Sequence, residues 1–147
     1  MSPSSPATSS SRRPQHRRRE ERGSVSIELV ILLPALFAIM FLGMQAALFY
    51  HARTTAIAAA EEGARAAGAE HGRTSDGTAA ANAFINEAGG DGVIENASTT
   101  VSRTATTATV TVTGFSLSVI PGWHVHITQT ATVPVERLTD PVAAGAP

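Results

Sequence analysis

Cysteine and lysine are both absent from this chain of 147 residues. Without cysteine there can be no disulfide and no thiolate metal site. Without lysine, the glycine-rich segments DGTAAA and GGDG lack a defining residue of a phosphate-binding loop. No Ser/His/Asp arrangement with a motif around the serine is visible either. These absences predict a protein that is not an enzyme and that holds no cofactor.

His124 and His126 are two histidines with a ligand-like spacing. On a strand they would share one face and could chelate a metal ion. No third ligand of clear spacing follows them, and histidines on surface strands are commoner than metal ligands. We therefore predict no metal site.

One long apolar run dominates the sequence. Residues 29–50 read LVILLPALFAIMFLGMQAALFY, in which Gln45 is the only clearly polar side chain before Tyr50. As a helix this run measures about 33 Å, which matches a hydrocarbon core of about 30 Å. The run predicts a transmembrane helix that is bent near Pro34, because proline removes one backbone hydrogen bond. A signal peptide is the main alternative, although its apolar core has only about 7–15 residues.

Positive charge is concentrated before the apolar run. Six arginines and two glutamates precede Ser24, a net charge of 6 − 2 = +4, and the rest of the chain carries 5 − 10 = −5. This asymmetry predicts that the N-terminus lies in the cytoplasm and the C-terminal part outside. A basic segment can also bind nucleic acid. This one is short, has no aromatic residue and adjoins the predicted span, so we expect no nucleic-acid partner.

The periodicity changes along the chain and predicts an α+β fold. One helix is expected from about Ser24 to His71, a second over Ser75–Glu87, and three antiparallel strands over 92–103, 106–120 and 124–138. The apolar positions shift from even to odd at Gly114, which predicts a β-bulge there. We expect five segments: a basic, disordered cytoplasmic leader (1–23), a transmembrane helix (24–50), its extension (51–72), a small extracytoplasmic α+β domain (73–138) and a loose tail (139–147).

The predicted domain contains few large apolar residues. A sheet of about three strands needs a helix on one face to bury an adequate core. We expect the large apolar side chains to form that core; they are Phe84, Ile85, Phe115, Leu117 and Trp123.

Residues 22–68 resemble the TadE-like family of pseudopilin-like pilus assembly proteins, which belong to the tight-adherence (Flp) branch of type IV pili. The shared pattern consists of basic residues, Gly23, Glu28 five positions later, Pro34 early in the apolar run, and the EEGARAA of residues 61–67. The resemblance implies a pilin-like fold and a bacterial protein of the cytoplasmic membrane. It also implies a structural, non-enzymatic role in pilus assembly or in a related secretion apparatus.

The resemblance implies a role for three residues at the start of the helix. A prepilin peptidase would cut between Gly23 and Ser24, and Glu28 would then pair with the new α-ammonium group of a neighbouring subunit. Processed members of this branch typically carry tyrosine after the glutamate, whereas Leu29 stands here. The alternative is that Glu28 only lies among lipid headgroups, where a negative charge favours the helix N-terminus.

The expected partners are therefore membrane lipid, other pilins or pseudopilins, the pilus assembly platform and a prepilin peptidase. The alternative function is a plain single-pass anchor that carries an extracytoplasmic binding module and never enters a filament.

Overall fold

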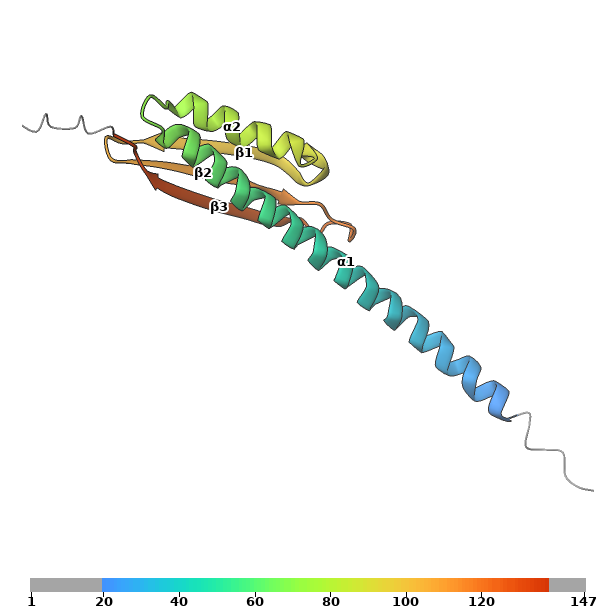
Figure 1. Ribbon diagram of the computed structural model, residues 1–147. Helices are drawn as coiled ribbons and strands as arrows, with labels where there is room; N and C mark the ends of the chain where they lie inside the picture. The colour runs from blue at the N-terminus through green and yellow to red at the C-terminus, as the bar shows by residue number, and fades with distance from the viewer. Residues whose placement is uncertain (1–19, 138–147) are drawn as a thin grey trace, which may run out of the picture. The chain divides into compact units, whose positions relative to one another are not determined.

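The computed structural model describes residues 20–137, with side chains from Glu28 onward. Its elements are α1 (Glu20–Gly68), α2 (Thr74–Glu87), η1 (Gly90–Gly92), β1 (Ile94–Arg103), β2 (Thr107–Ser116) and β3 (Val125–Pro134). The chain divides into two compact units, Met1–Ile39 and Met40–Pro147. These elements confirm the predicted α+β class, with a long apolar N-terminal helix, a short second helix and a three-stranded antiparallel sheet (Figure 1).

The helix bounds differ slightly from those expected. Helix α1 begins at Glu20 instead of Ser24 and ends at Gly68 instead of His71. The early end has a tertiary cause, because the amide of Glu136, just beyond β3, donates a hydrogen bond of 2.9 Å to the Gly68 carbonyl oxygen. The predicted disordered leader and loose tail fall largely on residues 1–19 and 138–147, which lie outside the described residues.

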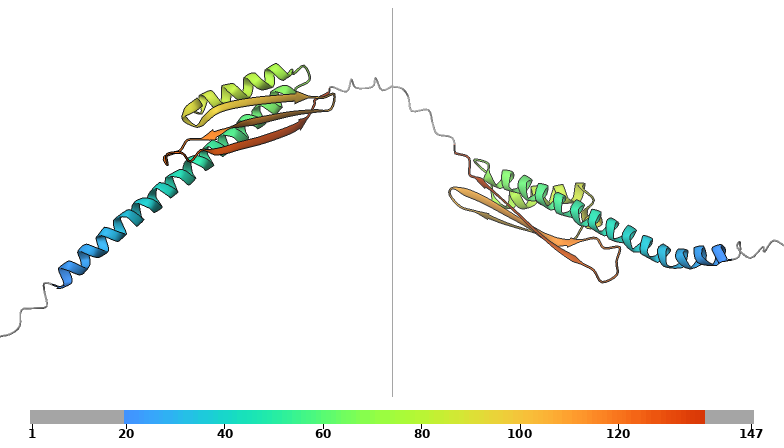
Figure 2. Two further views of the ribbon diagram at one scale, coloured as in Figure 1. Left: turned by 180° about the vertical axis from the view of Figure 1, so that it is seen from behind. Right: turned by 90° about the horizontal axis from the view of Figure 1, so that it is seen from below.

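The sheet has the order β1-β2-β3, and both pairs of neighbours are antiparallel. Along β2 the burial alternates residue by residue, as expected for a strand with one face on a core. Ala108, Val110 and Val112 point inward and are fully buried. The three views agree that α2 and the part of α1 beside it lie on one face of the sheet (Figures 1 and 2).

The predicted bulge lies in the facing strand and not in β2. The register shifts between Glu95 and Ser98 of β1, opposite Gly114. Strand β2 keeps its alternation through this point, because Gly114 and Ser116 remain on the buried face and Phe115 lies on the other. A Cβ atom on Gly114 would collide with the side chain of Ile94. Because Gly114 has no side chain, the Ile94 side chain of the bulged strand can pack against it.

Small side chains form most of the core. The helical side of the core consists of alanines spaced along one face of α1: Ala52, Ala56, Ala59, Ala60 and Ala64. They belong to the same core cluster as Val110 and Val112 of β2. Because alanine side chains are small, helix and sheet can approach closely. Ile85 is buried as expected and Phe84 is partly buried. The prediction that Trp123 belongs to the core is wrong, since 46% of its surface is exposed.

Candidate functional site

The N-terminal stretch of α1 exposes large apolar side chains on every side. Every residue from Glu28 to Met44 is exposed, and Val30 and Ile31 each show 71% of their surface. Among the described residues, one helix is long and apolar enough to cross a membrane, and this stretch belongs to it. In water so large an apolar surface would be strongly unfavourable, whereas lipid tails match it.

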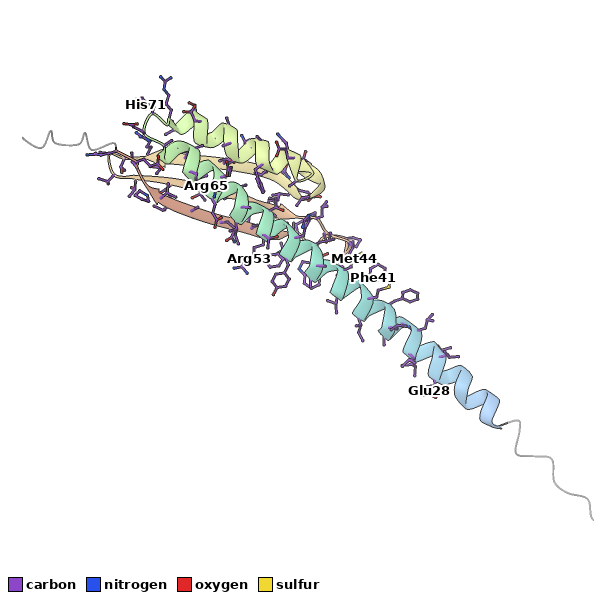
Figure 3. The ribbon with its side chains drawn as sticks, viewed as in Figure 1. Glu28, Phe41, Met44, Arg53, Arg65 and His71 are labelled. Atoms are coloured by element: carbon purple, nitrogen blue, oxygen red, sulfur yellow. The ribbon has the colours of Figure 1, made fainter. Side chains whose placement is uncertain are left out.

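The three residues implied at the start of the helix all lie in α1. Gly23 and Ser24 fall within its first turns, and Glu28 is exposed where the apolar stretch begins (Figure 3). Pro34 lies inside the same helix. It has no N–H to donate, so the Val30 carbonyl lacks its usual helical partner. The bend at Pro34, the cleavage and the role of Glu28 stay predictions.

Gln45 divides the apolar run in two. Its side chain is only 5% exposed, although residues 28–44 before it are all exposed. The side-chain oxygen accepts a hydrogen bond of 3.0 Å from the Val119 amide, and Nε2 donates one of 3.3 Å to the Leu117 carbonyl. The Ser118 hydroxyl lies 3.1 Å from the same side-chain oxygen. The Gln45 carboxamide is thus held by three hydrogen bonds to the β2–β3 loop, residues 117–124.

The packed part of the helix therefore starts inside the predicted span. The unit that contains the sheet includes α1 from Met40 onward, burial on α1 starts at Gln45 among the described side chains, and Phe49 packs against the core. Residues 29–44 are left as the exposed apolar stretch, about 24 Å of helix. A bilayer with a hydrocarbon core of about 30 Å would also need part of α1 before Leu29.

Arg103 holds the other end of the packed helix. Its guanidinium donates hydrogen bonds of 2.7 Å to the Ala67 carbonyl and 3.3 Å to the Ala69 carbonyl. Carbonyl groups in the last turn of a helix have no helical partner, and a cation there also favours the helix dipole. Arg103 and Gln45 thus fasten α1 to opposite ends of the sheet.

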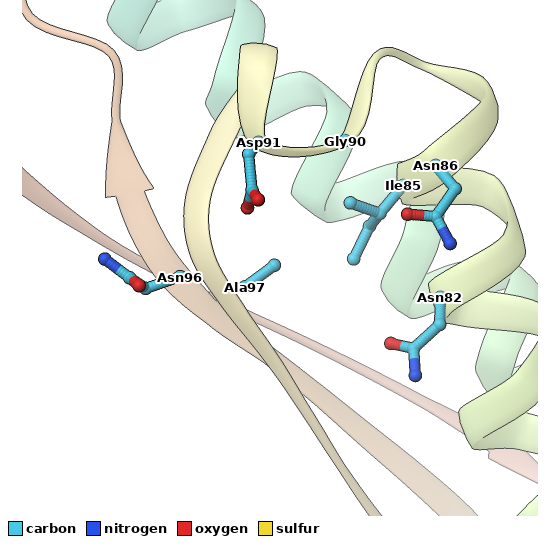
Figure 4. A pocket seen from close by; sticks show the side chains of 7 residues that line it. All are labelled: Asn82, Ile85, Asn86, Gly90, Asp91, Asn96 and Ala97. Carbon is cyan, nitrogen blue, oxygen red and sulfur yellow. The ribbon is translucent and has the colours of Figure 1, made fainter.

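A polar hollow between α2 and the start of β1 resembles no active site. A cavity of about 340 Å³ is lined by Asn82, Asn86, Asp91, Asn96 and their neighbours. Figure 4 shows these side chains spread around the rim instead of converging on one point. The Asn82 side-chain oxygen already accepts a hydrogen bond of 2.8 Å from Thr99. Asp91 is the one titratable side chain that lines this hollow, so it has no partner group there with which to form a nucleophile–base pair.

The two histidines of the HVH segment have different neighbours. The imidazole of His124 lies 3.6 Å from the carboxylate of Glu95, whereas the His126 ring packs edge-on against Phe115 with centroids 5.2 Å apart. No group of three His, Cys, Asp or Glu side chains that could hold a metal ion occurs between residues 28 and 137.

These features define a class: an α+β protein whose N-terminal helix is long and apolar enough to span a membrane and continues into a small sheet domain. Within that class, residues 23–65 match the family model TadE, described as TadE-like protein. The match confirms the family resemblance over the apolar helix and the alanine-rich part of α1. It supports a pilus-associated protein. No curated protein and no solved structure matches this chain.

Proposed function

We propose that this chain is a structural, non-enzymatic pseudopilin-like subunit of a tight-adherence pilus or a related secretion apparatus. The observation that carries the proposal is the TadE-like match over residues 23–65, which begins at Gly23 and includes the exposed apolar helix. In this proposal α1 anchors the chain in the cytoplasmic membrane by a single pass. Its arginine-rich segment stays inside, and the sheet domain lies outside.

We further propose that the chain is processed between Gly23 and Ser24. The cut would put a new α-ammonium group on Ser24 and make Glu28 the fifth residue of the mature chain, at the edge of the lipid. A carboxylate in that position is costly unless it is paired. Pairing with the ammonium group of a neighbouring subunit would neutralise both charges and set the axial register of two packed helices.

The test is the intact mass of the chain purified from membranes of a host that has its own prepilin peptidase. A mature chain that begins at Ser24 supports the processing. A chain that retains the arginine leader would contradict it, and Glu28 would then be only a headgroup contact. Either chain should be recovered in the membrane fraction, so anchoring is tested separately.

A second candidate function is a plain anchored binding module, and the outer face of the sheet favours it. No described element covers this face, and paired hydroxyls line it: Thr109 with Thr132 and Thr111 with Thr130, each at 3.0 Å. Such a face could contact a polar partner without a filament. Cysteine cross-linking between Leu36→Cys side chains in native membranes separates the two functions. The variant carries one cysteine and each chain can form one such disulfide, so cross-linked dimers support the subunit and a monomer alone supports the module.

A further inference from the structure

The β2–β3 loop, residues 117–124, presents an apolar tip beside α1. It carries no charged residue before His124, and its sequence reads LSVIPGWH. Pro121, Gly122 and Trp123 are exposed, and Val119 and Ile120 are half-buried. An exposed indole in a small domain with few aromatic residues calls for an explanation, because Trp side chains are usually well buried.

Gln45 fixes the height of this loop along α1. Its hydrogen bonds to Leu117 and Val119 place the loop beside residue 45 of the helix. In the turn that precedes Gln45, Phe41 and Met44 expose 43% and 47% of their surfaces. Figure 3 labels both side chains on α1. These side chains belong to the same compact unit as the loop. A membrane that covers Phe41 and Met44 therefore ends close to the level of the loop.

The first charged side chain after the apolar stretch confirms this level. Arg53 is exposed on α1 two turns beyond Gln45, a rise of about 12 Å along the helix. The level of the loop on α1 thus lies beyond the exposed side chains of Phe41 and Met44 and before Arg53, the first charged residue after the apolar run. Tryptophan is enriched at this depth, where its ring meets apolar chains and its N–H meets headgroups.

Polar groups of the loop are hydrogen-bonded within the protein, as a place with little water requires. The Trp123 amide donates a hydrogen bond of 3.1 Å to the Ile120 carbonyl, and the Ile120 amide donates one of 3.2 Å to the Ser118 hydroxyl. The Ser118 hydroxyl also lies 2.7 Å from the Ile120 carbonyl. Together with the bonds to Gln45, these contacts satisfy polar groups that lipid could not.

We infer that the β2–β3 loop is a second membrane contact. Its tip, with Trp123, enters the boundary between headgroups and acyl chains beside α1, and Gln45 holds it there. The contact would set how deeply α1 sits and would fix the sheet domain against the lipid surface. This inference rests on the membrane anchoring in the proposed function but not on cleavage or on filament assembly.

Trp123 reports on the inference directly, because the chain has one tryptophan. The full-length chain is reconstituted at low density into phosphatidylcholine vesicles whose acyl chains are brominated either near the headgroup or near the bilayer centre. Headgroup-proximal bromine should quench Trp123 roughly twofold more than central bromine, as expected for an interfacial ring. Vesicles should also shield the ring from acrylamide.

Two outcomes would overturn the inference. Trp123 that is open to acrylamide and insensitive to both brominated lipids lies in water. Trp123 that is shielded from acrylamide yet insensitive to the lipids is covered by protein, such as a second copy, and the shielding should then weaken as the vesicles are diluted with lipid. Flotation of the vesicles after an alkaline wash reports anchoring separately. A chain that floats but shows no quenching refutes the loop contact alone, whereas a chain that does not float refutes the anchoring as well.

A matched pair of variants completes the test. Pro121→Glu puts a charge on the exposed tip of the loop, and quenching by headgroup-proximal bromine should fall roughly twofold or more because a carboxylate resists burial in lipid. Ala105→Glu puts the same charge in the exposed hairpin between β1 and β2, at the opposite end of the sheet. It should leave the quenching unchanged. Equal quenching in the two variants would count against the contact.

Discussion

The Gln45 side chain accepts a hydrogen bond from the Val119 amide at 3.0 Å, although 74 residues separate the two in sequence. A carboxamide on an apolar helix would be unfavourable in lipid, and a loop amide without a partner would be unfavourable in a core. The hydrogen bond thus removes the free-energy cost that each polar group would have without a partner. The pair also fixes which residue of α1 marks the start of the sheet domain.

Gln45→Leu should loosen the β2–β3 loop without unfolding α1. The Val119 amide and the Leu117 carbonyl would lose their partners, at a cost of about 1–3 kcal/mol for each buried polar group left unsatisfied. Hydrogen exchange of a peptide that covers residues 117–120, measured on the full chain in detergent, should quicken by roughly tenfold or more. Met44→Leu changes an exposed neighbour and should leave the exchange unchanged. Unchanged exchange in Gln45→Leu would show that these bonds do not hold the loop.

Gly63 should tolerate no side chain, because it lies where α1 and α2 touch. A Cβ atom there would lie 2.7 Å from the Gly77 carbonyl oxygen and 3.0 Å from the Ala81 side chain. Gly63→Ala should therefore force the helices apart and cost about 1–3 kcal/mol. The melting temperature of the full chain in detergent, followed by circular dichroism, should fall by roughly 4 °C or more.

Gly43→Ala is the matched control for this substitution. It lies in the same helix, and a Cβ atom there would meet nothing within 4 Å. The melting temperature should stay at the wild-type value or rise, because alanine favours a helix over glycine by up to about 1 kcal/mol. Equal melting of Gly63→Ala and Gly43→Ala would show that α1 and α2 are not in close contact.

The fold class could be predicted from sequence because each element carries its own periodicity. The continuous apolar run of residues 29–50 and the alternation around Val110 and Val112 are local signals, and both are confirmed as a helix and a strand. The extent of α1 was less predictable. It ends at Gly68 because Glu136 and Arg103 satisfy its last carbonyls, and neither partner is near in sequence.

The core is less predictable from sequence, because the size of a side chain does not decide here whether it is buried. Trp123 is exposed, whereas alanines such as Ala52 and Ala56 are fully buried. An alanine-rich helix has no pattern that distinguishes its packed face from its exposed face. The role of Gln45 had one visible signal, its isolation in an apolar run. Its partners in the β2–β3 loop could come only from the fold.

The proposed topology rests on the arginine asymmetry and can be measured in living cells. A reporter that is active only outside the cytoplasm, fused after Pro147, should be active. Replacing the six arginines that precede Ser24 with neutral residues should weaken or invert the orientation, because they hold that flank in the cytoplasm. Replacing the five arginines after the apolar run should not. Activity of a cytoplasm-only reporter after Pro147 in the wild-type chain would contradict the orientation.

Gly23 and Glu28 should fail in different ways if they act as the proposed function requires. Gly23→Val should insert normally yet keep its leader, because a side chain at the cleavage position would obstruct the peptidase. Glu28→Ala should be cut normally yet associate poorly with partner subunits, since the ammonium group of the neighbour would lose its counter-charge. Intact mass and cross-linking in membranes measure the two effects. If Glu28 is only a headgroup contact worth about 1 kcal/mol or less, both variants should behave as the wild-type chain does. The reciprocal results, a cut Gly23→Val chain or a fully associating Glu28→Ala chain, would each remove one half of the proposal.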